Sequence, residues 1–224
     1  MSIAARNAIL AGGAALPYDA EVEYLESTGN QYIDTGVYLT NDDEIECSIY
    51  YASNNSGTMR AMGCRSSAYS PWLCFPLRTW CGDIASQGAG DYASYRANYN
   101  KDAPSGRNLR MITGKNRRVL YVDDTIVAQN MTMFSGTFQS EDTCKIFRTT
   151  DTNKSFIGKV YWCEVRGHNN MSFIPVRFTN ENGVTEGAMF DRVSGELFRN
   201  AGSGAFTIGP DASAANGGGI SANA

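Results

Sequence analysis

The scarcest residue in this 224-residue sequence is histidine, which occurs once, as His168. Histidine titrates near neutral pH and is the commonest metal ligand, so most chemistry of that kind would have to use this one position. His168 lies in Arg166-Gly-His-Asn-Asn170, a composition typical of a turn, and no Gly-x-Ser-x-Gly nucleophile motif accompanies it. We therefore expect an exposed loop histidine without a catalytic role.

An excess of basic residues is also lacking. The chain has 19 lysine and arginine residues against 23 aspartate and glutamate residues, which gives a net charge of −4. Proteins that bind nucleic acid need a basic surface to displace counterions, so we expect no nucleic-acid partner. No apolar run approaches the roughly 18 residues of a membrane-spanning helix, so we expect no membrane partner.

Cysteine is too sparse for a small disulfide-stapled domain. The six cysteines include no pair at Cys-x-x-Cys spacing, so the sequence does not favour a zinc site. Cys47 shares one face of a predicted strand with Ile45 and Ile49, as a small buried hydrophobic side chain would. We expect reduced cysteines in the core, while one or more disulfides remains an open alternative.

Extended segments dominate what is present. Hydrophobic residues make up 42% of the chain and charged residues 19%, enough apolar material for a packed core. In residues 44–51, Ile45, Cys47, Ile49 and Tyr51 alternate with polar residues and Tyr50, which predicts a half-buried strand. Further strands are predicted at 20–26, 30–37, 58–65, 71–78, 107–113, 117–122, 125–129, 143–149, 156–166, 172–178, 184–190, 196–199 and 204–208.

Dense strands with frequent turn signals predict an all-β fold, a two-sheet antiparallel jelly-roll sandwich. We assign residues 19–210 to this domain and 211–224, rich in Gly, Ala, Ser and Asn, to a tail. Residues 82–106 have weak patterning and predict a long surface insertion. Pro175 lacks a backbone donor, so its strand is predicted at a sheet edge or at a bulge.

The first 18 residues are predicted to be an anchor. Ser2 can cap a short helix that Gly12 would end, and an extended segment is the alternative. Such a short helix is marginal alone in water, so it must pack on its own domain or on a neighbouring subunit. The apolar side chains expected to make that contact are Ile3, Ile9 and Leu10.

Two blocks of sequence resemble a known family. The first is Glu23-Tyr-Leu-Glu-Ser-Thr-Gly-Asn-Gln-Tyr-Ile-Asp-Thr-Gly36. The second is Phe156-Ile-Gly-Lys-Val-Tyr-Trp-Cys-Glu-Val-Arg166, continued by residues 173–177, 189–191, 194–198 and 200–206. Together they resemble the concanavalin A-like (laminin-G-like) jelly-roll modules of phage virion proteins and gut-bacterial surface proteins. The resemblance implies the sandwich fold, and the family includes glycan binders, adhesion domains and structural subunits.

Aromatic residues with nearby arginines are the best candidates for ligand binding. Aromatic rings stack on the apolar faces of sugars, while arginine supplies directional hydrogen bonds. The competing interpretation is that the tryptophans belong to the core and that the tyrosines cover a sheet. The candidates surround the predicted insertion and are Trp72, Trp80, Tyr92, Tyr95, Arg96, Tyr99 and Arg107.

Acidic residues offer two weaker hypotheses. Glu21 and Glu26 lie in Glu-Val-Glu-Tyr-Leu-Glu, which is similar to the paired-carboxylate motif of jelly-roll glycosidases, although solvated acids at a strand edge are the favoured explanation. The pairs Asp42-Asp43, Asp123-Asp124 and Glu141-Asp142 make loop calcium possible, but none has the alternating spacing of a calcium loop. No cofactor or metal ligand is therefore assigned.

These features lead to a functional expectation. We expect a non-enzymatic structural or adhesion protein of a phage virion, such as a head fibre, a capsid decoration or a tail-associated subunit. It would contact other virion proteins through the N-terminal segment, form a homo-oligomer and bind glycans. The alternatives are a carbohydrate-binding lectin on the surface of a gut bacterium and a glycosidase that uses Glu21 and Glu26.

Overall fold

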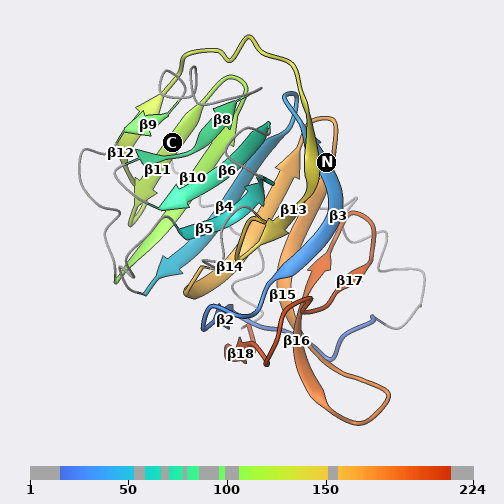
Figure 1. The fold of residues 1–224 in the computed structure, drawn as a ribbon. Coiled ribbons are helices and arrows are strands. Elements are labelled where there is room, and N and C mark those ends of the chain that lie inside the picture. Colours follow the sequence, from blue (N-terminus) through green and yellow to red (C-terminus); the bar gives the residue numbers. More distant parts are fainter. Residues whose placement is uncertain are drawn as a thin grey trace, which may run out of the picture.

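The computed structural model describes residues 16–52, 59–66, 71–77, 80–85, 96–98, 106–150 and 156–212. Within these ranges every regular element is a β-strand, and two antiparallel sheets lie one over the other (Figure 1). The predicted all-β, two-sheet sandwich is confirmed. Ile3, Ile9 and Leu10 lie outside the described residues, so the anchor stays a prediction, as do the domain bounds.

The larger sheet has the strand order β12-β11-β10-β4-β14-β15-β16-β17, with the short strands β1, β2 and β18 attached beside it. Its strands are β1 (Ala20–Glu21), β2 (Leu25–Ser27), β4 (Glu44–Tyr51), β10 (Arg107–Gly114), β11 (Arg118–Val122), β12 (Thr125–Asn130), β14 (Gly158–Arg166), β15 (Met171–Thr179), β16 (Thr185–Asp191), β17 (Leu197–Phe198) and β18 (Thr207–Ile208). The β15–β16 hairpin extends beyond the sandwich (Figure 1).

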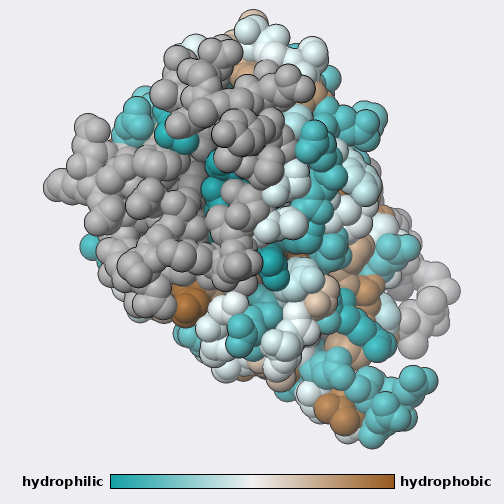
Figure 2. All heavy atoms as spheres, viewed as in Figure 1, coloured by the Kyte–Doolittle hydropathy of each residue, from teal (hydrophilic) through white to brown (hydrophobic). Residues whose placement is uncertain are grey.

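The smaller sheet has the strand order β3-β13-β5-β6-β8. Its strands are β3 (Ile33–Thr40), β13 (Gln139–Ile146), β5 (Met59–Cys64), β6 (Trp72–Leu77) and β8 (Asp83–Ala85), and a separate pair joins β7 (Trp80–Cys81) to β9 (Ala97–Asn98). Figure 2 shows hydrophilic residues over the part of this face where β3 and β13 lie.

The core lies between the sheets because alternate side chains of each strand point inward. In β4, Ile45, Cys47 and Ile49 are completely buried, whereas Glu44 and Tyr50 on the opposite face are only partly buried. The three buried side chains of β4 belong to one apolar cluster with side chains of the smaller sheet, such as Ile33, Leu39, Phe75 and Ile146. Removal of this apolar surface from water is the main force that holds the two sheets together.

A second apolar cluster forms on the other face of β15 and β16. It contains Val176, Phe178 and Phe190, and Tyr18 packs against it with its ring centroid 4.9 Å from that of Phe190. The chain before β1 is thus fastened to the outside of the larger sheet. At the opposite terminus, Ala212 donates a backbone hydrogen bond of 2.9 Å to Glu21, so the first residues of the predicted tail are attached to the domain.

The cysteines follow the sequence expectation where the structure describes them. Cys47, Cys64, Cys74, Cys144 and Cys163 are completely buried as thiols, which confirms reduced core cysteines at these positions. Each acts as a small hydrophobic side chain between the strands.

Two sequence expectations are corrected here. The predicted insertion at 82–106 is partly wrong, because Asp83–Ala85 forms β8 of the smaller sheet and Ile84 and Ala85 are buried. The edge assignment for Pro175 is also wrong, because its strand, β15, lies between β14 and β16. Pairing on one side of β15 changes from β14, at residues 171–173, to β1, at residues 176–177, so the missing donor falls in the gap between these partners.

Candidate functional site

A row of polar and aromatic side chains crosses the outer face of the larger sheet. Asn108 in β10 is the register partner of Tyr50 in β4, which is the partner of Lys159 in β14, which in turn is the partner of Glu26 in β2. Neighbouring strands are about 4.8 Å apart, so the row spans roughly 14 Å across the sheet. The alternation that buries Ile49 and Val160 places Tyr50 and Lys159 on the opposite, outer face.

A β-bulge adds two neighbouring aromatic residues to this face. The register of β14 against β4 shifts between Val160 and Trp162, leaving Tyr161 as the extra residue. Tyr161 and Trp162 are both half-buried, between the fully buried Val160 and Cys163. A bulge of this kind puts two consecutive side chains on one side of a strand and so breaks the strict alternation.

We refer to Tyr24, Tyr50, Asn108, Lys159, Tyr161 and Trp162 as the tyrosine face. The Lys159 ammonium group lies 4.0 Å from the centroid of the Tyr24 ring and 5.6 Å from that of Tyr50. The Tyr24 and Tyr161 rings meet edge to face at 6.1 Å, and the Tyr161 hydroxyl donates a hydrogen bond of 3.3 Å to Asn108 Oδ1. These contacts hold the three tyrosines, the lysine and the amide in one arrangement.

The titration properties of the tyrosine face agree with this close packing. Burial acts to lower the pKa of Lys159, but interactions with the Tyr24 phenol and the Glu26 carboxylate outweigh it and raise the pKa above its ordinary value. The pKa of Tyr161 is also raised, chiefly by burial. At neutral pH the face therefore presents the Lys159 ammonium group and the neutral phenol of Tyr161.

A network of ion pairs bounds the tyrosine face on one side. The nearly buried Glu46 accepts a hydrogen bond of 3.1 Å from Arg110 Nη1 and is also paired with Arg166. Glu44 binds Arg117 through two hydrogen bonds of 2.8 and 2.9 Å. The carboxylates of this network are occupied by guanidinium groups and make a rigid border.

Chemically, the tyrosine face combines partly exposed rings with directional polar groups. Aromatic faces bind the apolar C–H faces of ring-shaped polar molecules, and phenol, amide and ammonium groups bond to their hydroxyls. The rings are held by one another and by Lys159, so little side-chain freedom is lost when a ligand binds.

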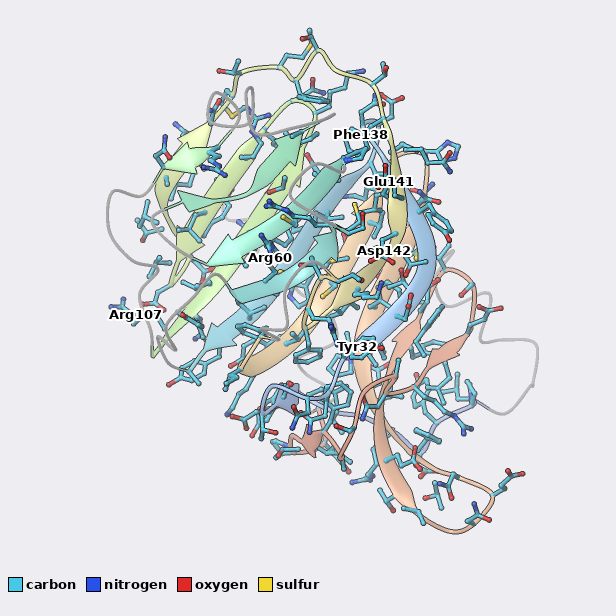
Figure 3. The ribbon with its side chains drawn as sticks, viewed as in Figure 1. Tyr32, Arg60, Arg107, Phe138, Glu141 and Asp142 are labelled. Carbon is cyan, nitrogen blue, oxygen red and sulfur yellow. The ribbon has the colours of Figure 1, made fainter. Side chains whose placement is uncertain are left out.

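The structure describes only part of the ligand-binding site that was predicted from the sequence. Tyr92, Tyr95 and Tyr99 lie outside the described residues, as do the side chains of Trp72 and Trp80. Arg96 is half-buried, and its backbone oxygen accepts a hydrogen bond of 2.9 Å from Asn130. Arg107, at the start of β10, is exposed and paired with Asp123. Figure 3 shows Arg107 well away from Arg60 and Asp142, which lie in the smaller sheet. The described residues thus leave the predicted site untested.

The two glutamates of the glycosidase hypothesis have different surroundings. Glu21 in β1 accepts hydrogen bonds of 2.9 Å from Arg192 Nη2 and of 3.2 Å from the Tyr18 hydroxyl. Glu26 lies in β2, opposite Lys159 of the tyrosine face. The Glu21 carboxylate is thus held in an ion pair and is not presented as a free nucleophile.

The acidic pairs considered for calcium are used within the fold. Asp43 accepts hydrogen bonds from Thr40 and Asn169, Asp123 pairs with Arg107, and Asp142 bonds to Lys145 at 2.8 Å. The described part of the chain contains no group of three or more residues that could hold a metal ion.

His168 is exposed in the turn after β14, as expected. In the same described part, no helix has the length and hydrophobicity to cross a membrane.

Comparisons with known proteins found distant structural likenesses. No protein-family model matches the chain, and no curated protein matches it significantly. One similar structure is a candidate carbohydrate-binding protein from Bacteroides ovatus, with 13% identity, a TM-score of 0.49 and coverage of 86% of this chain and 61% of that one. This chain therefore spans less than two thirds of the length of the Bacteroides protein.

Two further structures are similar at the same distant level. One is domain 4 of AbnA, a GH43 extracellular arabinanase from Geobacillus stearothermophilus in complex with arabinotriose, with 11% identity, a TM-score of 0.43 and coverage of 66% of this chain and 76% of that one. The other is a heptameric pentraxin from Limulus polyphemus, with 10% identity, a TM-score of 0.41 and coverage of 68% and 77%. These likenesses are too distant to assign a function, which must come from the residues of this chain.

Proposed function

We propose that this domain binds carbohydrate on the tyrosine face. The observation that carries the proposal is the row Asn108–Tyr50–Lys159, in which an amide, a phenol ring and an ammonium group lie side by side on three adjacent strands. Tyr24, Tyr161 and Trp162 extend this row with further rings. Such a face can stack on several sugar units while its polar groups bond to their hydroxyls.

The role that we propose is binding without bond cleavage. Glycoside hydrolysis requires two carboxyl groups on either side of the scissile bond, one of them as acid and the other as base or nucleophile. At the edge of the tyrosine face, Glu26 is the register partner of Lys159, while Glu44 and Glu46 in the border are held by arginines. The proposal therefore predicts that a bound oligosaccharide is recovered intact after prolonged incubation.

The setting of this binding activity is a further part of the proposal. A phage particle and the surface of a gut bacterium are the two predicted settings, and in either one a glycan-binding face would serve attachment. Incorporation of the purified chain into phage particles would favour the first setting. Association with intact bacterial cells through covalent or lipid attachment would favour the second.

A glycan array with two tyrosine variants tests the binding site. Tyr50→Ala removes the central ring of the row, whereas Tyr38→Ala removes a ring that is 48% exposed on β3 of the other sheet. We expect the wild-type protein and Tyr38→Ala to bind the same glycans, and Tyr50→Ala to lose about tenfold or more in affinity. Absence of binding by the wild-type protein, or equal losses in both variants, would contradict the proposal.

A further inference from the structure

Two cysteines face one another in the core beneath the tyrosine face. Cys47 in β4 and Cys163 in β14 are register partners within five consecutive pairs, which run from Trp162↔Ser48 to Arg166↔Glu44. Both side chains are completely buried. Directly opposite residues of antiparallel strands have Cα atoms about 4.5 or 5.5 Å apart, and a disulfide accommodates Cα separations of about 4.4–6.8 Å. The register alone therefore brings the two positions within bonding range.

The folded state keeps Cys163 as a thiol. Burial, followed by the hydrogen bond with Cys47, raises the pKa of Cys163 well above its ordinary value. A disulfide forms only through a thiolate, which these surroundings disfavour. Oxidation must therefore occur while β4 and β14 are separating or coming together, when water reaches the sulfurs.

The other described core thiols are not register partners of one another in the strand ladders. Cys144 lies where the register of β13 against β3 shifts, between Thr143 and Lys145. Cys64 in β5 is near Cys144, but the two lie one position past Lys145↔Gly63, where the β13–β5 pairing ends. Cys74 packs with Ala85 in a separate cluster. Cys47 and Cys163 are thus two cysteines that the strand pairing places directly opposite each other, two positions past the β-bulge at Tyr161.

We propose that Cys47 and Cys163 form a cross-strand disulfide when the chain folds in the presence of a low-molecular-weight disulfide such as glutathione disulfide. One cysteine thiolate attacks the reagent, which breaks its S–S bond, forms a mixed disulfide and releases one glutathione thiolate. The second cysteine thiolate then attacks the cysteine sulfur of the mixed disulfide and releases the other. The cysteine pair loses two electrons, and glutathione disulfide gains them as it becomes two glutathione thiols.

This bond would join the two strands that carry Tyr50 and Lys159. A link between residues 47 and 163 would prevent β4 and β14 from separating or slipping in register beneath the tyrosine face. It would also close a long loop in the unfolded chain, which lowers the entropy of that state and stabilises the fold. The disulfide would therefore stabilise the support of the tyrosine face without contacting a ligand.

Refolding under defined redox conditions tests the proposal. The denatured full-length protein is refolded with a mixture of reduced and oxidised glutathione or with dithiothreitol, alkylated, digested and mapped by mass spectrometry. We expect a peptide containing Cys47 linked to one containing Cys163 in the first sample only. We also expect a higher urea midpoint that dithiothreitol reverses.

Two variants serve as controls for this test. Cys74→Ala removes a thiol outside the pair and should retain both the linked peptide and the higher midpoint, whereas Cys163→Ala should lose both. Alkylation of all six cysteines of the refolded wild-type protein, or a predominant link between Cys64 and Cys144, would overturn the proposal. The wild-type map decides the matter even if Cys163→Ala does not fold.

Discussion

The ammonium group of Lys159 lies over the ring of Tyr24, 4.0 Å from its centroid. Tyr24 precedes the short strand β2, whereas Lys159 lies in β14, so the contact joins two segments far apart in sequence. A cation over an aromatic face is attracted by the ring electrons and restricts the rotation of both side chains. The arrangement of the tyrosine face is therefore present before any ligand binds, which lowers the entropic cost of binding.

Replacement of this lysine tests whether the cation contributes to binding. Lys159→Met keeps most of the apolar stem but removes the charge and the hydrogen-bond donors. We expect the affinity for the glycans selected on the array to fall by roughly threefold to tenfold, and the free energy of unfolding to change by about 1 kcal/mol or less. Calorimetric titration measures the first quantity and urea unfolding the second. Lys115→Met, which removes a lysine paired with Asp42, is the matched control. Unchanged affinity in Lys159→Met would contradict this role.

Adjacent arginines in β11 and the turn before it should respond very differently to the same substitution. Arg118 is completely buried, and its guanidinium group donates to the Gly114, Lys115 and Thr132 carbonyls and to Asn130 at 2.6–3.3 Å. A lysine has one ammonium group and cannot reproduce this fork of donors. We expect Arg118→Lys to lower the free energy of unfolding by about 2–4 kcal/mol, because buried polar groups lose their partners.

Arg117→Lys is the control for that prediction. The Arg117 side chain is 41% exposed and pairs with Glu44, an interaction for which about 1 kcal/mol or less is expected. Urea unfolding followed by tryptophan fluorescence measures both variants. Similar losses in the two variants would show that the burial of Arg118 is not the cause.

Gly158 should be intolerant of a side chain because of a close backbone contact. It has φ of +147°, and a Cβ atom there would lie 2.3 Å from the carbonyl oxygen of Tyr50. Gly36 has φ of +69° with open space around the same position. We expect Gly36→Ala to cost roughly 1–2 kcal/mol from backbone strain alone. Gly158→Ala should cost more in urea unfolding and should also weaken glycan binding, since it displaces Tyr50. Equal stability losses would contradict this explanation.

Tyr18 provides a pH-dependent test of the attachment before β1. Burial, together with the charge of Glu21, raises its pKa from 10.0 to about 12. The neutral phenol is favoured in the folded state, so its stabilisation is complete below pH 10 and is lost as the pH rises toward 12. Ultraviolet titration of tyrosinate should show late titration of Tyr18 and Tyr161 in the wild-type protein, and one late-titrating group fewer in Tyr18→Phe. An unchanged number of late-titrating groups in Tyr18→Phe would contradict the raised pKa of Tyr18.

Part of the tyrosine face was predictable from the sequence. The alternation in residues 44–51 correctly places Ile45, Cys47 and Ile49 in the core and leaves Tyr50 on the other face. The same rule fails in β14, where it assigns Tyr161 and Trp162 to opposite faces. The β-bulge places both on the outer face, and a bulge depends on the register against β4, which the local sequence does not encode.

Other parts depended on strand partners that a local pattern does not specify. Pro175 was predicted at a sheet edge or a bulge because it cannot donate a hydrogen bond, yet it lies in an interior strand where one neighbour ends and another begins. Lys159 and Tyr24 have no sequence signal that joins them, because their contact follows from the pairing of β2 with β14. The candidates around residues 86–95 and 99–105 lie outside the described residues and stay predictions.

The most direct test of carbohydrate binding on the tyrosine face is to map the binding site on the protein by nuclear magnetic resonance. Backbone and side-chain resonances would be followed while the best glycan from the array is titrated into the wild-type protein. We predict that the largest shifts occur at Asn108, Tyr50, Lys159 and Tyr161, on the outer face of β10, β4 and β14. Shifts confined to the smaller sheet or to the segment around residues 86–105, with the tyrosine face unchanged, would contradict the proposed site.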